Sequence, residues 1–288
     1  MQNSKAVLVT GASSGIGRDC ALRLAASGFR VFAGIRRQED GERLRAESSG
    51  AITPVILDVT DSASIAAAAE TVSRALDGVG LGAGLYGLVN NAGIAVAGPL
   101  EMLPTEALRR QLDVNVVGQI AVTQAFLPML RAARGRIIIM GSILGRMALP
   151  FVGAYSAAKF ALEALAESLS MEIKGSGVSV SIIEPGNIAT PIWKKSKSGA
   201  VDTARDLNAK KWEMYRAPAE SFQRYTDHAS ANGIPAARVA AVVEKALKAG
   251  RARSRYTVGW DSRILGRLAP LAPGRFRQWV VLKVVLRK

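Results

Sequence analysis

The sequence predicts an α/β fold: a Rossmann-type, doubly wound parallel β-sheet with helices on both faces, in a single domain. Short apolar runs rich in Val and Ile alternate with longer segments whose apolar residues recur every three or four positions. A glycine-rich stretch, GASSGIG, joins the first apolar run to the first helical segment, as in the turn that holds a dinucleotide pyrophosphate. With 288 residues, the chain is long enough to bury a sizeable core without disulfide bonds.

The elements can be placed in order from these patterns. Asp61 or Ser62 can cap the helix that follows the third strand. A long helical stretch covers about residues 105–133 and is interrupted near Gly118, and a later helix covers 234–249. We expect seven strands, at residues 5–10, 30–37, 52–60, 85–93 (with the turn that ends it), 135–142, 178–186 and 255–259.

Glycines and polar residues follow the carboxyl ends of six of these strands. Ligands of such sheets bind beyond the carboxyl ends of the strands. Six purely structural loops would not be expected to gather these residue types on one edge, so a binding site is predicted there. The six are the GASSGIG loop, Arg36, Asp58, the NNAG turn, Ser142 and the PGNIAT segment.

Tyr155 and Lys159 are four residues apart in a segment with helical character, so both side chains lie on one face of a helix. A phenol titrates near pH ~10, which is too high for a good base at neutral pH. A nearby ammonium favours the phenolate, and we therefore expect the pKa of Tyr155 to be lowered. Such a tyrosine can exchange a proton with a carbonyl or alcohol oxygen.

These motifs, in their order and spacing, resemble the short-chain dehydrogenase/reductase family over about residues 5–260. The resemblance is carried by TGASSGIG (10–17), NNAG (90–93), Asn115, Ser142, YSAAK (155–159) and PGNIAT (185–190). Segments such as GLVNNAGIAVAGPLE and EPGNIATPIW are similar to the branch that contains 17β-hydroxysteroid and retinol dehydrogenases.

The resemblance implies roles for individual residues. Ser142 would orient the substrate oxygen, Lys159 would hold the nicotinamide ribose, and Asn115 would break its helix and hold a water linked to the lysine. The implied catalytic set is Asn115, Ser142, Tyr155 and Lys159. The implied cofactor site comprises Gly11, Ser13, Ser14, Gly15, Ile16, Gly17, Arg36, Asp58, Val59, Asn90, Ala92, Gly93, Tyr155, Lys159, Pro185, Gly186, Ile188 and Thr190. Within it, Asp58 would accept from the adenine amino group, and Asn90 would be as much structural as ligand-binding.

The second strand ends in GIRR, with no acid before Glu39. NAD sites usually place an acid about 20 residues after the glycine loop. Arg36 instead offers a guanidinium that suits a 2′-phosphate, which favours NADP(H) over NAD(H). For Arg37, a solvated loop position is the better interpretation.

Residues 191–232 are expected to form a substrate loop, since large apolar and aromatic side chains lie there among many charges. We expect Leu144, Leu149, Phe151 and Trp193 to contact an apolar substrate. Anchoring of the segment to the core is an equal alternative for any one of its aromatic residues.

The chain carries 38 Lys and Arg against 23 Asp and Glu, a net charge of +15. Residues 1–260 are the expected catalytic domain, and residues 261–288 are a basic C-terminal extension. This extension can lie on an anionic membrane or cover the pocket, and packing or lidding is favoured over membrane contact.

No nucleic-acid motif is present. One Cys and one His leave no basis for a catalytic metal, and the single Cys fits a reducing, cytoplasmic location.

The leading hypothesis is an NADP(H)-dependent oxidoreductase that interconverts an alcohol and a ketone or aldehyde on an apolar, steroid- or retinoid-like substrate. A 3-oxoacyl thioester reductase is the alternative in chemistry, and a non-catalytic nucleotide-binding scaffold is the alternative of another class.

The two helical stretches at 105–133 and 154–174 carry more Ala, Leu and Val than a sheet-covering face needs. Because family members pair such helices, a homodimer or homotetramer is expected.

Overall fold

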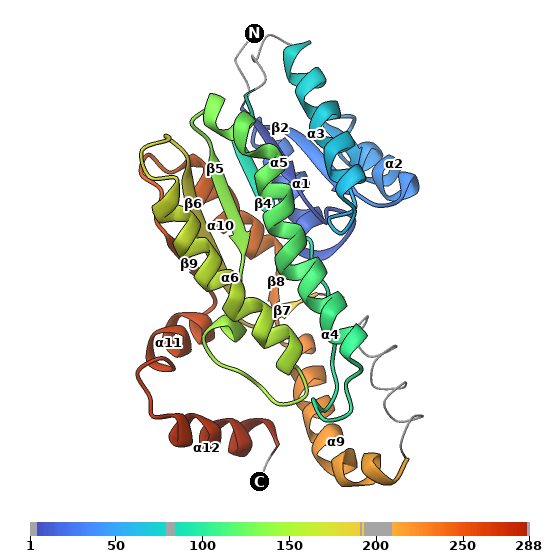
Figure 1. The fold of residues 1–288 in the computed structure, drawn as a ribbon, viewed down its shortest axis with the longest axis vertical. Coiled ribbons are helices and arrows are strands. Elements are labelled where there is room, and N and C mark those ends of the chain that lie inside the picture. The colour runs from blue at the N-terminus through green and yellow to red at the C-terminus, as the bar shows by residue number, and fades with distance from the viewer. Residues whose placement is uncertain (1–4, 79–83, 191, 193–208, 287–288) are drawn as a thin grey trace.

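The computed structural model describes residues 5–78, 84–190, 192 and 209–286. Its centre is a parallel sheet with strand order β3-β2-β1-β4-β5-β6-β9, the doubly wound arrangement expected from the sequence (Figure 1). The strands are β1 (Ala6–Val9), β2 (Arg30–Ile35), β3 (Ile52–Ile56), β4 (Gly87–Asn90), β5 (Arg136–Met140), β6 (Ser179–Pro185) and β9 (Arg255–Val258). Two short strands, β7 (Ile188–Ala189) and β8 (Ile234–Pro235), pair with each other outside this sheet.

Helices cover both faces of the sheet, and each face has its own apolar core. On β5, Ile138 and Met140 pack into one core while Ile137 and Ile139 pack into the other, as the alternation of side chains along a strand requires. The first face is covered by α1 (Gly15–Ala26), α2 (Gln38–Glu47) and α10 (Ala236–Lys248). The second is covered by α3 (Ser62–Asp77), α5 (Gly118–Ala132) and α6 (Gly153–Glu172).

The expected helix starts and interruptions have physical counterparts. The Asp61 carboxylate caps α3 by accepting from the Ala63 N–H at 2.9 Å. The long stretch from residue 105 is divided into α4 (Thr105–Leu112), a π-helical turn at Asp113–Val117 and α5. A π turn of this kind is often found at a functional site, and Asn115 lies in its middle.

Residues 209–231 differ from expectation, because they form a helix, α9 (Ala209–Ala231), rather than a loop. Tyr215, Phe222 and Tyr225 are spaced by seven and three residues, which is the periodicity of one helix face. Many charges and an internal Pro218 obscure that pattern in the sequence. Residues 193–208, and with them Trp193, lie outside the described part of the chain.

The C-terminal extension consists largely of two helices, α11 (Trp260–Leu268) and α12 (Gly274–Val285). Both lie beyond the carboxyl edge of the sheet, and α12 contacts α9 there (Figure 1). Among the described residues, none of the helices combines the length and the apolar character that crossing a bilayer requires.

Candidate active site

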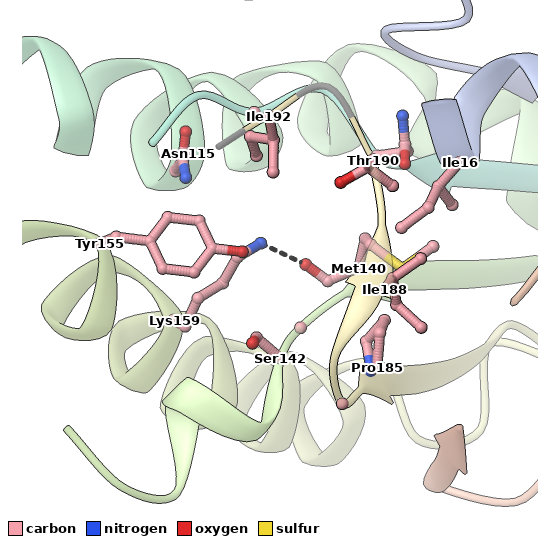
Figure 2. A pocket seen from close by; sticks show the side chains of 14 residues that line it. Ile16, Asn115, Met140, Ser142, Tyr155, Lys159, Pro185, Ile188, Thr190 and Ile192 are labelled. Carbon is pink, nitrogen blue, oxygen red and sulfur yellow. Dashed lines mark hydrogen bonds between the residues drawn. The ribbon is translucent and has the colours of Figure 1, made fainter. Parts of the chain in front are cut away.

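A pocket opens at the carboxyl edge of the sheet, where the sequence places the site (Figure 2). Ten of its lining residues are expected ones: Ile16, Gly93, Asn115, Ser142, Tyr155, Lys159, Pro185, Gly186, Ile188 and Thr190. Four others were not anticipated: Asn91, Met140, Gly141 and Ile192. The remaining expected cofactor residues are not among its lining residues.

The glycine loop is closely packed against the turn after β4. Gly11 and Gly15 have φ values of +64° and +57°, a region that L side chains rarely adopt. A Cβ on Gly17 would lie 2.3 Å from the Gly11 carbonyl oxygen, so any side chain there would push the loop away from α1. The N-cap residue of α1, Ser14, makes no side-chain cap, which leaves the first N–H groups of the helix for an anion.

Asn91 holds this loop, and sequence reasoning missed it. Its Nδ2 donates to the Thr10 and Gly11 carbonyl oxygens at 3.0 and 3.3 Å. The Thr10 hydroxyl in turn accepts from the backbone N–H groups of Asn91 and Ala92, both at 2.9 Å. The neighbouring Asn90 points to the other face and donates to the Thr123 hydroxyl at 2.7 Å. Asn90 is therefore structural in this fold, and Asn91 is the asparagine that borders the pocket.

Asn115 joins the π turn to the segment after β4. Its side chain accepts from the Ile94 N–H at 2.8 Å and donates to the Ile94 carbonyl oxygen at 2.9 Å. Gln111, one turn earlier, makes the same kind of paired bond to Val96 N–H and Ile94 O. The two buried amides thereby fix one wall of the pocket through the backbone.

Tyr155 and Lys159 enter the pocket from α6, with Asn115 on the opposite side and Ser142 nearby at the end of β5 (Figure 2). The Lys159 ammonium donates to the Met140 carbonyl oxygen at 2.6 Å and lies 5.5 Å from the centroid of the Tyr155 ring. Both side chains are buried, at 4% and 8% exposure. The Ser142 hydroxyl accepts from the Leu144 N–H at 3.1 Å, which turns it toward the tyrosine.

The expected lowering of the tyrosine pKa is wrong for this structure. Burial raises the pKa of Tyr155 to about 12, and a hydrogen bond with Ser142 offsets only part of that rise. Burial also lowers the pKa of Lys159 to about 8, against the opposing attraction of Glu163. Desolvation is the larger effect on both pKa values because both groups lie in the interior. A buried phenol with a raised pKa keeps its proton at neutral pH and can serve as an acid.

A buried charge network lies behind Lys159. Glu163 is one turn further along α6, and Arg255 of β9 donates to its carboxylate at 2.5 Å. Arg255 also bonds to Glu184 of β6, and Arg146 pairs with Glu184 at 3.2 Å. Burial, followed by repulsion from Glu163, raises the pKa of Glu184. The network fixes β6, β9 and α6 relative to one another beside the pocket.

Arg36 lies exposed directly after β2, next to the place expected for the adenosine end of a cofactor. The nearby Asp58 carboxylate accepts from the Thr60 N–H and hydroxyl at 2.9 and 2.7 Å. These bonds, and to a lesser extent Arg36, hold the pKa of Asp58 below its usual value. Arg37 pairs with Asp40 at 3.1 Å, which fits a surface role. Val59 is buried. Its backbone packs closely on Gly118, since a Cβ at that glycine would lie only 2.5 Å from the Val59 carbonyl oxygen.

An apolar cluster that includes Tyr155 borders the pocket. Leu144 is buried in it, and Leu149 and Phe151 pack against it, as expected for an apolar wall. The Phe151 ring lies 5.5 Å from the ring of Phe222 in α9. The C-terminal helix α12 also contributes, through Val281 and Val285. Through α12, the C-terminal extension packs on the apolar cluster beside the pocket.

The described residues fit a nicotinamide dinucleotide. The glycine loop packs so closely on the start of α1 that a Cβ at Gly17 would collide with it. The first N–H groups of α1, which the Ser14 side chain does not cap, are available to an anion. Ile188 and Thr190 line the same pocket as Ile16, together with Pro185 and Gly186 (Figure 2).

The model of the short chain dehydrogenase family matches residues 5–200. The chain belongs to the short-chain dehydrogenase/reductase family. Its curated relatives include a 3-amino-tetrahydro-pyrrolizinone reductase of Xenorhabdus hominickii, 38% identical over 90% of this chain and 88% of the relative. Human retinol dehydrogenase 16 is 36% identical over 91% of this chain and 82% of its own length. Human 17-beta-hydroxysteroid dehydrogenase type 6 is 39% identical over 90% and 82%.

Among solved structures, a short chain dehydrogenase from Burkholderia cenocepacia in complex with NADP is similar. It is 27% identical, covers 98% of this chain and 99% of that chain, and has a TM-score of 0.70. These similarities confirm the fold and the relation to retinol and 17β-hydroxysteroid dehydrogenases. The protein is an oxidoreductase that interconverts alcohols and carbonyl compounds with a nicotinamide cofactor.

Proposed function

We propose that this short-chain dehydrogenase/reductase uses NADP(H), employs Tyr155 as its acid and base, and acts on an apolar, steroid- or retinoid-like substrate. The observation that carries the proposal is the meeting of three groups in one pocket beside an apolar cluster. Tyr155, Ser142 and Lys159 supply proton chemistry, and the cluster of aliphatic and aromatic side chains supplies an apolar surface.

The roles follow from position and protonation. Tyr155 keeps its proton at neutral pH and donates it from the phenol to the substrate oxygen during reduction. Ser142 donates a hydrogen bond to the same oxygen and stabilises the charge that develops there. Lys159 binds the nicotinamide ribose and places a positive charge beside the phenol. A bound nicotinamide supplies or accepts the hydride; Asn115 holds the wall opposite Tyr155.

The preference for NADP(H) rests on Arg36. Its guanidinium is exposed beyond β2, and no carboxylate occupies the positions between Ile35 and Glu39. Arg37, the other candidate, is paired with Asp40. A 2′-phosphate beside Arg36 gains a charge-assisted contact that a ribose hydroxyl lacks.

A substrate panel tests the proposal. The purified protein is incubated with NADPH or NADH and with a ketosteroid, retinal, a pyrrolizinone and a short 3-oxoacyl thioester. The proposal predicts faster NADPH consumption with the ketosteroid or retinal. Preference for the thioester or the pyrrolizinone would replace the substrate class, and cofactor binding without turnover on any carbonyl would support a scaffold.

We also propose a reducing compartment such as the cytoplasm for this protein. Cys20, the only cysteine, is buried in α1, and burial raises its pKa. The thiol is packed as an apolar group and is poorly suited to disulfide exchange.

A further inference from the structure

The last two helices present a large exposed apolar surface. We call residues 260–286, which comprise α11, α12 and the turn between them, the C-terminal helix pair. Trp260 and Leu271 are 74% and 82% exposed. Of the fifteen large apolar side chains exposed in the described chain, nine belong to this pair: Trp260, Ile264, Leu265, Leu268, Leu271, Phe276, Trp279, Leu282 and Val284. Such a concentration marks an interaction surface.

The C-terminal helix pair is firmly held on its inner side. Val281 and Val285 of α12 are buried in the cluster beside the pocket. At the start of α11, the Ser262 hydroxyl donates to the Glu184 carbonyl oxygen at 2.7 Å. The Asp261 carboxylate accepts from the Asn187 N–H at 2.7 Å, next to the Pro185–Gly186 wall of the pocket. The exposed apolar face is therefore a fixed surface, because the opposite side of each helix is already packed.

Apolar side chains on the outer side follow the helix repeat. Trp260, Ile264 and Leu268 are four residues apart, which places them in one stripe along α11. On α12, the rings of Phe276 and Trp279 stack at 6.0 Å. Tryptophan and phenylalanine are residues typical of the boundary between lipid headgroups and acyl chains.

The charges on the C-terminal helix pair are of one sign. Five basic residues lie on it: Arg263, Arg267, Arg275, Arg277 and Lys283. No ion pair involves any of them within the described residues. The single acid of the pair, Asp261, uses one carboxylate oxygen on Asn187 N–H and the other on Ser262 N–H. The outward charge is therefore positive.

This charge decides between a second copy and another partner. In a two-fold interface the same patch meets itself, so five cations would face five cations. An anionic lipid surface instead accepts both features, since its headgroups neutralise Lys and Arg while its interface takes up Trp, Phe and Leu. We propose that the C-terminal helix pair docks the protein on an anionic lipid bilayer, with α11 and α12 lying in the plane of the interface.

Docking at this place has a consequence for the site. The C-terminal helix pair lies over the carboxyl edge of the sheet, beside α9 (Figure 1). The apolar cluster next to Tyr155 would therefore lie between the pocket and the bilayer. The bilayer would serve as a reservoir for the apolar substrate proposed above. This consequence rests on the proposed function, whereas bilayer docking does not, and a binding assay tests docking alone.

The test is flotation of the full-length protein with vesicles of phosphatidylcholine, with or without roughly one third phosphatidylserine. We expect flotation with the anionic vesicles only, reduced at about 0.5 M salt because exposed charges are screened. Each basic residue near such a surface contributes about fivefold, so loss of four should weaken binding by roughly 600-fold. The charge variant is Arg263→Gln/Arg267→Gln/Arg275→Gln/Lys283→Gln. Its matched control, with the same loss of charge elsewhere, is Arg45→Gln/Arg131→Gln/Arg238→Gln/Arg251→Gln.

A second measurement is made first on the unaltered protein, where the result does not depend on how a variant folds. Lipids with brominated acyl chains should quench Trp fluorescence, and Trp260→Phe/Trp279→Phe should lose most of that quenching. Absence of both flotation and quenching with anionic vesicles would overturn the proposal. Equal weakening by the charge variant and its control would do so as well, since it would show only a general charge effect. If Leu271→Ser/Trp279→Ser reduced the oligomeric state of a protein that ignores vesicles, the surface would belong to a second copy.

Discussion

Lys159 donates its buried ammonium to the Met140 carbonyl oxygen at 2.6 Å, and this bond connects α6 to the end of β5 (Figure 2). The lysine is thus positioned by the backbone of the sheet, one helical turn from Tyr155. A charge held in this way stays beside the phenol before any ligand arrives. Burial desolvates both groups, which raises the pKa of Tyr155 and lowers the pKa of Lys159, so that the neutral form of each is favoured.

Tyr155→Phe tests the proposed acid. The ring and its packing remain, while the proton donor is lost. Carbonyl reduction should fall by at least ~100-fold, the lower range for general acid catalysis, with little change in NADPH affinity. Steady-state kinetics and cofactor titration measure the two effects. Tyr225→Phe is the control, because this half-buried tyrosine packs on the same apolar cluster without lining the pocket. Unchanged turnover in Tyr155→Phe would contradict the mechanism.

Arg36→Ala tests the cofactor preference. Loss of a charge-assisted contact to a 2′-phosphate should weaken NADPH binding by about 2 kcal/mol, or roughly 30-fold. NADH, which has a hydroxyl at that place, should be little affected. Arg37→Ala removes the same charge from the next position, where the side chain pairs with Asp40, and should leave both affinities nearly unchanged. Comparable losses for NADPH and NADH in Arg36→Ala would remove Arg36 as the selector.

Much of this site could be predicted because parallel strands impose it. Once strand ends are located, their loops must meet at one edge, and Ser142 and the PGNIAT segment do line the pocket there. Sequence could not choose between Asn90 and Asn91, which are identical neighbours. Side chains alternate across a sheet, so a one-residue difference in register decides which asparagine holds the glycine loop and which meets Thr123.

Two other features depend on tertiary structure. The spacing of Tyr155 and Lys159 gives their proximity, but the balance between charge attraction and desolvation depends on burial. The fold buries the phenol of Tyr155, and the resulting desolvation raises its pKa. In α9, charged residues and Pro218 interrupt the apolar periodicity by which a helix is predicted from sequence. The buried face of this helix is identified in the structure by the packing of Phe222 on Phe151.

Lys159→Met tests the desolvation of the lysine through the pH dependence of stability. The folded-state pKa of Lys159 is about 8, below the value of about 10.4 in an unfolded chain. Below pH ~8 both states are charged and burial destabilises the fold; above about pH 10.4 both are neutral and that cost is gone. Between these values the unfolded state binds more protons, so the wild type should gain stability with rising pH relative to the variant.

The gain should be on the order of 2–3 kcal/mol, as the shift in pKa implies. Urea denaturation from pH 7 to pH 10 measures the difference between wild type and Lys159→Met. Lys174→Met, at an exposed lysine just beyond α6, is the control and should follow the wild type at every pH. A difference between wild type and Lys159→Met that does not vary with pH would show that this ammonium is not desolvated.

The last prediction concerns assembly. Val117 in the π turn, and Phe160 and Met171 in α6, are 58%, 43% and 65% exposed, and the π turn and α6 are in contact. These apolar side chains lie on the two helical stretches expected to pair, so we expect a homodimer or homotetramer in which this face meets its own copy. Phe160→Glu/Met171→Glu places like charges opposite each other and should lower the oligomeric state in sedimentation velocity. Met214→Glu, at an equally exposed methionine of α9 (65%), should leave assembly unchanged. A wild-type protein that sediments as a monomer at every concentration would rule out this interface.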